Sequence, residues 1–220
     1  MKKKTLIIIA LIISQFVWAQ KQQDSTAYSF DFQFNDGLLL SFKDLKSNTA
    51  LPFRNIITKY DYRKGDFLKL LLKEKEIRFF KDGKKQLIPI SEVWGYVNKS
   101  HIYIQFNKKF YRVPAVGSIS FFMAKIEVEY QRSMDNWNMG MYGGFAGTES
   151  YKSEKLMQFL VDFTDGTIYD YSIQNIENLI SGNKTIYDAF NSLRKRQKRK
   201  NAFMYIKKYN DATPWYIYKN

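Results

Sequence analysis

The densest group of chemically active side chains in this sequence is a basic segment near its end. Eight lysines or arginines lie between Arg194 and Lys208 with no acidic residue among them: Arg194, Lys195, Arg196, Lys198, Arg199, Lys200, Lys207 and Lys208. Each cation held near an anionic membrane contributes about 1 kcal/mol of attraction, so the segment is predicted to dock on an anionic surface. The alternative is a solvated helix face that maintains solubility, because no Trp or Leu is interleaved at the charged end.

Carboxylates are the remaining candidates for acid–base chemistry. Asp162 and Asp170 flank a predicted hairpin and would approach each other across it if they formed the pair that a glycoside hydrolase needs. The alternative is that both are ordinary strand ends, as Asp165 before Gly166 is explained by the turn alone. Outside this candidate pair, no catalytic residue is predicted.

His101 is the only histidine, so a histidine-based triad would have to use it. The sequence has no Gly-x-Ser-x-Gly elbow and no cysteine, which removes the usual serine and thiol nucleophiles and the customary zinc ligand sets. We therefore expect His101 to be a surface histidine and predict neither a metal nor a cofactor.

One long irregular segment, residues 131–153, interrupts the pattern and carries Trp137, Tyr142 and Phe145 among four glycines. Long loops within compact domains are usually functional or disordered. The three aromatic residues are therefore the candidates for a recognition loop. The alternative is a hairpin tip whose aromatic side chains fold back onto the sheet.

The elements that must position these residues are predicted mainly from periodicity. Aromatic residues at every second position from Tyr28 to Phe34 predict a strand, and residues 67–73 and 76–81 are also β-rich, the latter followed by an Asp82-Gly83 hairpin turn. Further short strands are expected to continue this pattern to Tyr171. Together they predict an antiparallel, strongly curved sheet over about 28–171, resembling a barrel or a sandwich.

After Tyr171 the periodicity becomes helical. Ser172 is a candidate cap for a helix carrying Ile173, Ile176 and Ile180, and Gly182 ends it. A second helix is expected from Lys184 through the basic segment, to be stopped by Pro214. The fold class predicted is thus α+β, with two C-terminal helices over about 172–210 and one domain over 20–220.

The amino terminus predicts export. Three lysines precede an apolar run from Leu6 to Ile13, and Val17 with Ala19 supplies the small residues of a signal peptidase site, so residues 1–19 are predicted to be removed before Gln20. The alternative is an uncleaved anchor, for which the apolar run is too short. After cleavage we expect no transmembrane helix, and without a cysteine the product is not a lipoprotein.

Composition bounds the partners. Of 220 residues, 35 are Lys or Arg and 21 are Asp or Glu, so loss of the three signal lysines leaves a charge of about +11. Such a field favours anionic partners. In an exported protein these are a lipid head group, lipopolysaccharide or an acidic glycan, or else an envelope protein, in preference to nucleic acid.

Several phrases resemble ones found together in an uncharacterised family of small exported proteins of Gram-negative bacteria. They are residues 36–44, 93–104, 168–176 and 205–210, which together span most of the mature chain. The resemblance implies a periplasmic or secreted location and one continuous unit, and it implies no activity. We therefore predict a non-enzymatic envelope-binding module, with a carboxylate-based glycan hydrolase and an extracellular nucleic-acid binder as alternatives.

Overall fold

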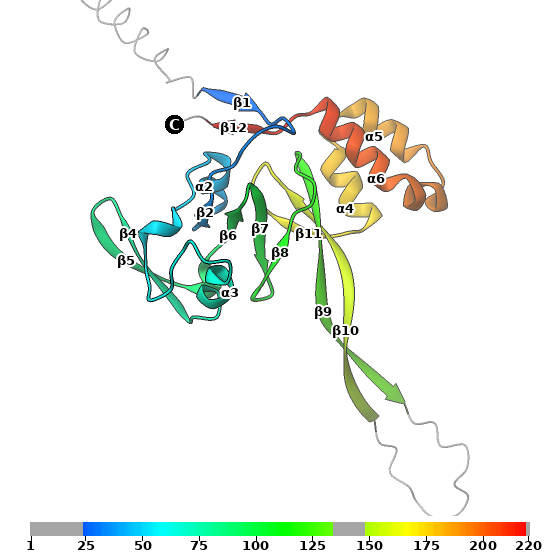
Figure 1. The fold of residues 1–220 in the computed structure, drawn as a ribbon. Helices are drawn as coiled ribbons and strands as arrows, with labels where there is room; N and C mark the ends of the chain where they lie inside the picture. Colours follow the sequence, from blue (N-terminus) through cyan, green and yellow to red (C-terminus); the bar gives the residue numbers. More distant parts are fainter. Residues whose placement is uncertain (1–23, 134–147, 219–220) are drawn as a thin grey trace, which may run out of the picture.

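The computed structural model describes residues 24–133 and 148–218, and this part of the chain contains four antiparallel sheets and a C-terminal group of helices (Figure 1). The strands are β1 (Ser25–Ala27), β2 (Gly37–Leu39), β3 (Ile56–Ile57), β4 (Glu76–Lys81), β5 (Lys84–Pro89), β6 (Gly95–Asn98), β7 (His101–Phe106), β8 (Lys109–Arg112), β9 (Ile119–Ser133), β10 (Thr148–Asp162), β11 (Ile168–Asp170) and β12 (Tyr216–Tyr218). The helices are α2 (Phe42–Lys46), α3 (Phe67–Leu71), α4 (Ile173–Ile180), α5 (Lys184–Asn191) and α6 (Lys195–Ala212), with 3-10 turns η1 (Phe53–Asn55) and η2 (Ile90–Glu92).

The sheet β2-β6-β7-β8 separates two hydrophobic cores. Successive strand residues point to opposite faces, so Leu39 and Val97 enter the first core while Leu38 and Tyr96 enter the second. The second core is completed by α3 and the sheet β3-β4-β5, from which Phe67, Leu71, Ile77 and Phe79 contribute buried side chains.

The sheet β11-β10-β9 covers the other side of the first core. Phe122 on β9 and Phe159 on β10 stack there with ring centroids 5.4 Å apart. On the opposite face, Ile119 and Leu160 are buried against α4, α5 and α6, which form a third core with Ile176, Ile180, Phe190, Ala202 and Ile206. Sheets and helices thus stack as layers, each burying one apolar face.

The two ends of the described chain meet beside the first core. β1 pairs with β12 in an antiparallel register that places Thr26 opposite Ile217. Phe34 and Trp215 are buried at this end, with centroids 6.1 Å apart in a stacked arrangement. The segment that follows β1 is therefore held to the C-terminal strand by both backbone pairing and ring packing.

The outer halves of β9 and β10 extend as a two-stranded ribbon beyond the rest of the molecule (Figure 1). Tyr130 stacks on Tyr151 across the ribbon, and Lys152 pairs with Glu127 at 3.7 Å. Exposed ion pairs of this kind add little stability, so cross-strand backbone bonding carries this extension.

Much of the local structure confirms the patterns in the sequence. The α+β class, the antiparallel sheets and the C-terminal helices are as predicted, and the sheets are not closed into a barrel. The β4–β5 hairpin turns at Asp82 and Gly83, which both have positive φ. Ser41 and Asp44 form a capping box at the start of α2, with the Asp44 carboxylate accepting from the Ser41 backbone N–H at 2.7 Å.

The strand predicted over residues 28–34 is wrong. The chain turns there, with the Phe32 N–H bonded to the Ser29 carbonyl at 3.0 Å, and no strand lies over these residues. Tyr28, Phe32 and Phe34 pack at the first core, whereas Phe30 is 93% exposed. The rings pack individually, and among the described residues no strand pairs with this segment, so the alternation does not mark a strand.

Two further predictions are corrected. Residues 67–71 form the helix α3, because Phe67 and Leu71 are one helical turn apart and both are buried. The predicted second C-terminal helix is two helices, α5 and α6, separated at Ser192–Arg194, where Arg194 is extended (φ −65°, ψ 151°). The break allows Phe190 of α5 and Ile206 of α6 to face one core.

Within the described residues, no helix is both long and apolar enough to cross a bilayer. The predicted signal peptide, residues 1–19, lies outside the described part of the chain.

Candidate functional site

The basic segment is positioned by three short-range signals in the sequence. The Ser172 hydroxyl accepts from the Asn175 N–H at 3.2 Å and begins α4, and the Asn183 side chain accepts from the Ile186 N–H at 3.2 Å and begins α5. At the start of α6 the Gln197 side chain accepts from the Arg194 N–H at 3.2 Å. Each contact satisfies a backbone donor near a helix start.

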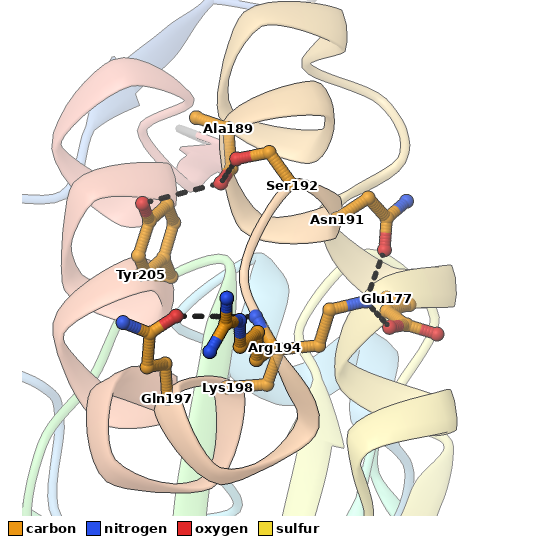
Figure 2. A network of polar contacts seen from close by, with 8 residues as sticks. All are labelled: Glu177, Ala189, Asn191, Ser192, Arg194, Gln197, Lys198 and Tyr205. Atoms are coloured by element: carbon orange, nitrogen blue, oxygen red, sulfur yellow. Dashed lines mark hydrogen bonds and ion pairs between the residues drawn. The ribbon is translucent and has the colours of Figure 1, made fainter.

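Lys198 does not belong to the free basic surface, although the sequence grouped it there. Its ammonium donates to the Glu177 carboxylate of α4 at 2.6 Å and to the Asn191 side chain of α5 at 2.8 Å (Figure 2). It also lies 5.5 Å from the centroid of the Phe190 ring. Since the Lys198 side chain is only 15% exposed, its role is to join the three helices.

Two more of the predicted cations have intramolecular contacts. Lys207 pairs with Asp211 one turn later at 2.8 Å, and Lys208 lies over the Tyr205 ring at 5.0 Å. These contacts are on the C-terminal half of α6. Near Lys208, Tyr205 also donates to the Ala189 carbonyl at 3.4 Å (Figure 2).

The remaining five predicted cations are exposed and have no ion-pair partner within the described residues. We name them the α6 basic cluster: Arg194, Lys195, Arg196, Arg199 and Lys200. All lie in the first turns of α6 or at its N-cap, and the first turn contains no acidic residue. The structure thus divides the predicted set of eight into five free and three engaged side chains.

The position of the α6 basic cluster works against helix stability. A helix start carries partial positive charge, so a cation there is unfavourable by about 0.3–1 kcal/mol at low ionic strength. Lys195 with Arg199 and Arg196 with Lys200 are also like charges four residues apart, each destabilising by about 0.2–0.5 kcal/mol. An anion bound at this helix end would reverse both effects, since it would meet cations and free backbone N–H groups together.

Two members of the cluster border an apolar cavity of about 390 Å³, which we name the α4/α6 cavity. Lys195 and Arg199 line it together with Tyr171, Ser172, Ile173, Ile176 and Ala202. Ile176 and Ala202 are 1% and 2% exposed, and burial raises the pKa of the Tyr171 hydroxyl. Tyr171 is therefore neutral at ordinary pH, and the cations are the charged groups of this cavity.

The structure does not bring Asp162 and Asp170 together. In the β10–β11 register Asp170 lies opposite Phe159, three residues from Asp162 along β10. An odd spacing places the two carboxylates on opposite faces of the sheet, about 10 Å apart along the strand. Asp162 instead accepts from the Thr164 N–H at 2.8 Å and so stabilises the following turn.

His101 is exposed, as predicted, and its Nε2 atom lies 3.2 Å from the Arg112 guanidinium. Because Arg can only donate, Nε2 is the acceptor in this contact. Both side chains line a second cavity, of about 820 Å³, that we name the aromatic cavity after Tyr28, Phe30, Phe32, Phe34 and Trp215 in its lining. The sequence signal for it was the run of aromatic residues over 28–34, which periodicity assigned to a strand.

The irregular segment predicted over 131–153 is too long, because residues 131–133 belong to β9 and 148–153 to β10. The predicted recognition-loop residues Trp137, Tyr142 and Phe145 lie outside the described residues. Within residues 24–133 and 148–218, no group of three or more His, Asp or Glu side chains could hold a metal ion. Comparisons of the chain with family models, curated proteins and solved structures found no match.

Proposed function

We propose that this protein is an exported, non-enzymatic module of the cell envelope that docks on an anionic lipid surface through the α6 basic cluster. The observation that carries the proposal is the accumulation at a helix start of five exposed cations without an ion-pair partner in the described part of the chain, where they oppose helix stability. A pattern selected only for stability would place acidic residues there. Export rests on the amino-terminal sequence and on the resemblance to small exported proteins.

The α4/α6 cavity supports a lipid in preference to a soluble anion. Its apolar floor lies beside Lys195 and Arg199, so one amphiphile could place an anionic head group on the cations and hydrocarbon against Ile173 and Ile176. Apolar contact contributes about 25 cal/mol per Å² removed from water, and each nearby cation contributes about 1 kcal/mol. The two terms act together only on a ligand with both properties.

The test is sedimentation of the mature protein with vesicles of 30 mol% phosphatidylglycerol in phosphatidylcholine and with pure phosphatidylcholine vesicles, at low and high salt. We expect binding to the anionic vesicles alone, weakened by salt because exposed charges are screened. Replacing Arg194, Lys195, Arg196, Arg199 and Lys200 with Gln should abolish it.

A control variant separates docking from total charge. Lys64, Lys69, Lys73, Lys84 and Lys85 are exposed, lie on or near α3 and β5, and have no ion-pair partner within the described residues. Changing these five to Gln lowers the net charge by the same amount, and we expect vesicle binding to persist. An equal loss of vesicle binding in both variants would show that binding depends only on net charge and would contradict the proposal.

A further inference from the structure

We propose that the aromatic cavity is a binding site for an acidic saccharide unit, separate from the lipid-docking site. It touches α6 only at Asn210 and Asp211, at the end of the helix opposite to the α6 basic cluster. With 1.5 Å of rise per residue the two ends of this helix are more than about 20 Å apart. Its volume of about 820 Å³ falls within the range of small-molecule sites.

The walls are built from rings that stack without filling the cavity. Tyr28 stacks on Phe34 at 5.9 Å, and Phe34 stacks on Trp215 at 6.1 Å. Phe30 borders the same cavity and is 93% exposed. An isolated exposed Phe needs no explanation, but one beside a stacked aromatic wall offers a flat surface for the C–H face of a sugar ring.

Trp215, which borders this cavity, carries a buried hydrogen-bond donor. Trp215 is 4% exposed, and its indole N–H has no partner within the described residues. A buried donor without a partner costs about 1–3 kcal/mol. Most buried polar groups in proteins are paired, so the Trp215 indole is an exception among the described residues.

The turn between β6 and β7 borders the cavity. Lys99 and Ser100, which join β6 to β7, have φ of 52° and 60°, a conformation that two-residue hairpin turns usually fill with Asn and Gly. The Ser100 hydroxyl accepts from the Phe34 N–H at 2.9 Å, and the Ser100 N–H donates to Asp36 at 3.1 Å. These two hydrogen bonds fasten the aromatic segment to the β6–β7 turn at the border of the cavity.

The polar groups around the rings specify the ligand class. Lys99, Arg112 and Asp31 border the cavity, as do the amides of Gln33 and Asn210. Sugar hydroxyls both donate and accept, so a polyhydroxylated ligand can use donors and carboxylates together, whereas a phosphate has no use for Asp31. Asp211 is paired with Lys207, which leaves the rim with more cations than free carboxylates and favours a carboxylated sugar, since Arg binds carboxylates with two hydrogen bonds.

The experiment is titration calorimetry of the mature protein with the trimers of galacturonic, glucuronic and mannuronic acid. The methyl ester of each trimer is the ligand control, because it keeps the shape and removes the charge. We expect at least one acid to bind, and its ester to bind at least tenfold more weakly. Absence of binding by all three acids, or equal binding of acid and ester, overturns the proposal.

Matched variants locate the site. Phe30→Ala and Arg112→Gln change exposed side chains, so the fold is expected to remain intact. Each variant should bind the acidic trimer about tenfold more weakly. Phe80→Ala and Arg54→Gln change exposed residues outside the cavity and should have no effect. If all four variants bind alike, the site is elsewhere and the proposal fails. The variant lacking the α6 basic cluster should retain saccharide binding, which distinguishes this site from vesicle docking.

Discussion

Lys198 is the sharpest test of how the basic segment divides between folding and binding. Replacing it with Met keeps the length and the helix propensity of the side chain and removes the charge. The change breaks the ion pair to Glu177 at 2.6 Å and the hydrogen bond to Asn191 at 2.8 Å, two polar contacts by which Lys198 links α6 to α4 and α5. We expect a loss of stability with little change in vesicle docking.

The magnitude follows from the exposure of the two partners. Removing one member of a fully buried ion pair costs about 3–5 kcal/mol because the other charge is left unpaired. The side chains of Lys198 and Glu177 are 15% and 25% exposed, so water partly compensates Glu177 and we expect a smaller loss, about 2–3 kcal/mol. For a chain of this length the melting temperature should fall by about 4–12 °C.

Thermal unfolding followed by circular dichroism measures this effect. Lys200→Met is the control, because Lys200 is exposed on the same helix and has no ion-pair partner within the described residues; it should change stability by less than about 0.5 kcal/mol. In vesicle sedimentation we expect the opposite ranking, with the larger effect in Lys200→Met. Lys200→Met should weaken docking about fivefold, the equivalent of about 1 kcal/mol, and folded Lys198→Met should bind almost as well as the unchanged protein.

A double-mutant cycle isolates the pair itself. Combining Lys198→Met with Glu177→Gln should give a coupling energy of about 1–2 kcal/mol, because the second change removes the stranded carboxylate. Two results would refute the reasoning: a melting temperature of Lys198→Met equal to that of Lys200→Met, or additive effects in the cycle.

Two further predictions concern the fold. Burial, and next to it the neighbouring Tyr103, raises the pKa of Tyr96 to about 12. The unfolded chain therefore loses this proton first, and stability should fall as the pH rises from about 10 to about 12. In Tyr96→Phe, the free energy of unfolding measured with urea should decrease less over this pH range. An unchanged pH dependence would assign the decrease to other tyrosines. Gly166→Ala forces a φ of +85° on Ala and places Cβ 2.6 Å from Phe42, whereas Gly83→Ala meets a φ of +71° in open space. We expect the free energy of unfolding to fall by about 2–4 kcal/mol in Gly166→Ala and by about 1 kcal/mol in Gly83→Ala. Equal losses of the two variants in chemical denaturation would show that Phe42 moves aside.

Local signals predicted the β4–β5 hairpin because it depends on residues close in sequence. The Asp82-Gly83 turn needs positive φ at both positions, and the flanking residues pair across it as expected. Ser41 with Asp44 reads as a capping box wherever it begins a helix. These elements need no information from the remainder of the chain.

The wrong strand predictions fall in segments whose apolar pattern fits both strand and helix, or which have no strand to pair with among the described residues. In residues 67–71 the apolar side chains are consistent with either strand or helix, and only packing of Phe67 and Leu71 into the second core decides for the helix. In residues 28–34 the alternation is that of a strand, but a strand needs a neighbour for its backbone groups. Among the described residues no strand pairs with this segment, which folds instead as one wall of the aromatic cavity.

For the candidate sites, the order of the amino acids sets which side chains are present, the net charge, and the helical period of the basic segment. The packing of the three helices selects which cations are engaged, since Glu177 on α4 and Asn191 on α5 reach Lys198 across the breaks between consecutive helices. The tertiary structure also separated Asp162 from Asp170 through one strand register and joined residues near 30, 100, 112 and 215 around one cavity. Charge and periodicity are properties of the chain, whereas pairing and cavities depend on long-range packing, which no local pattern encodes.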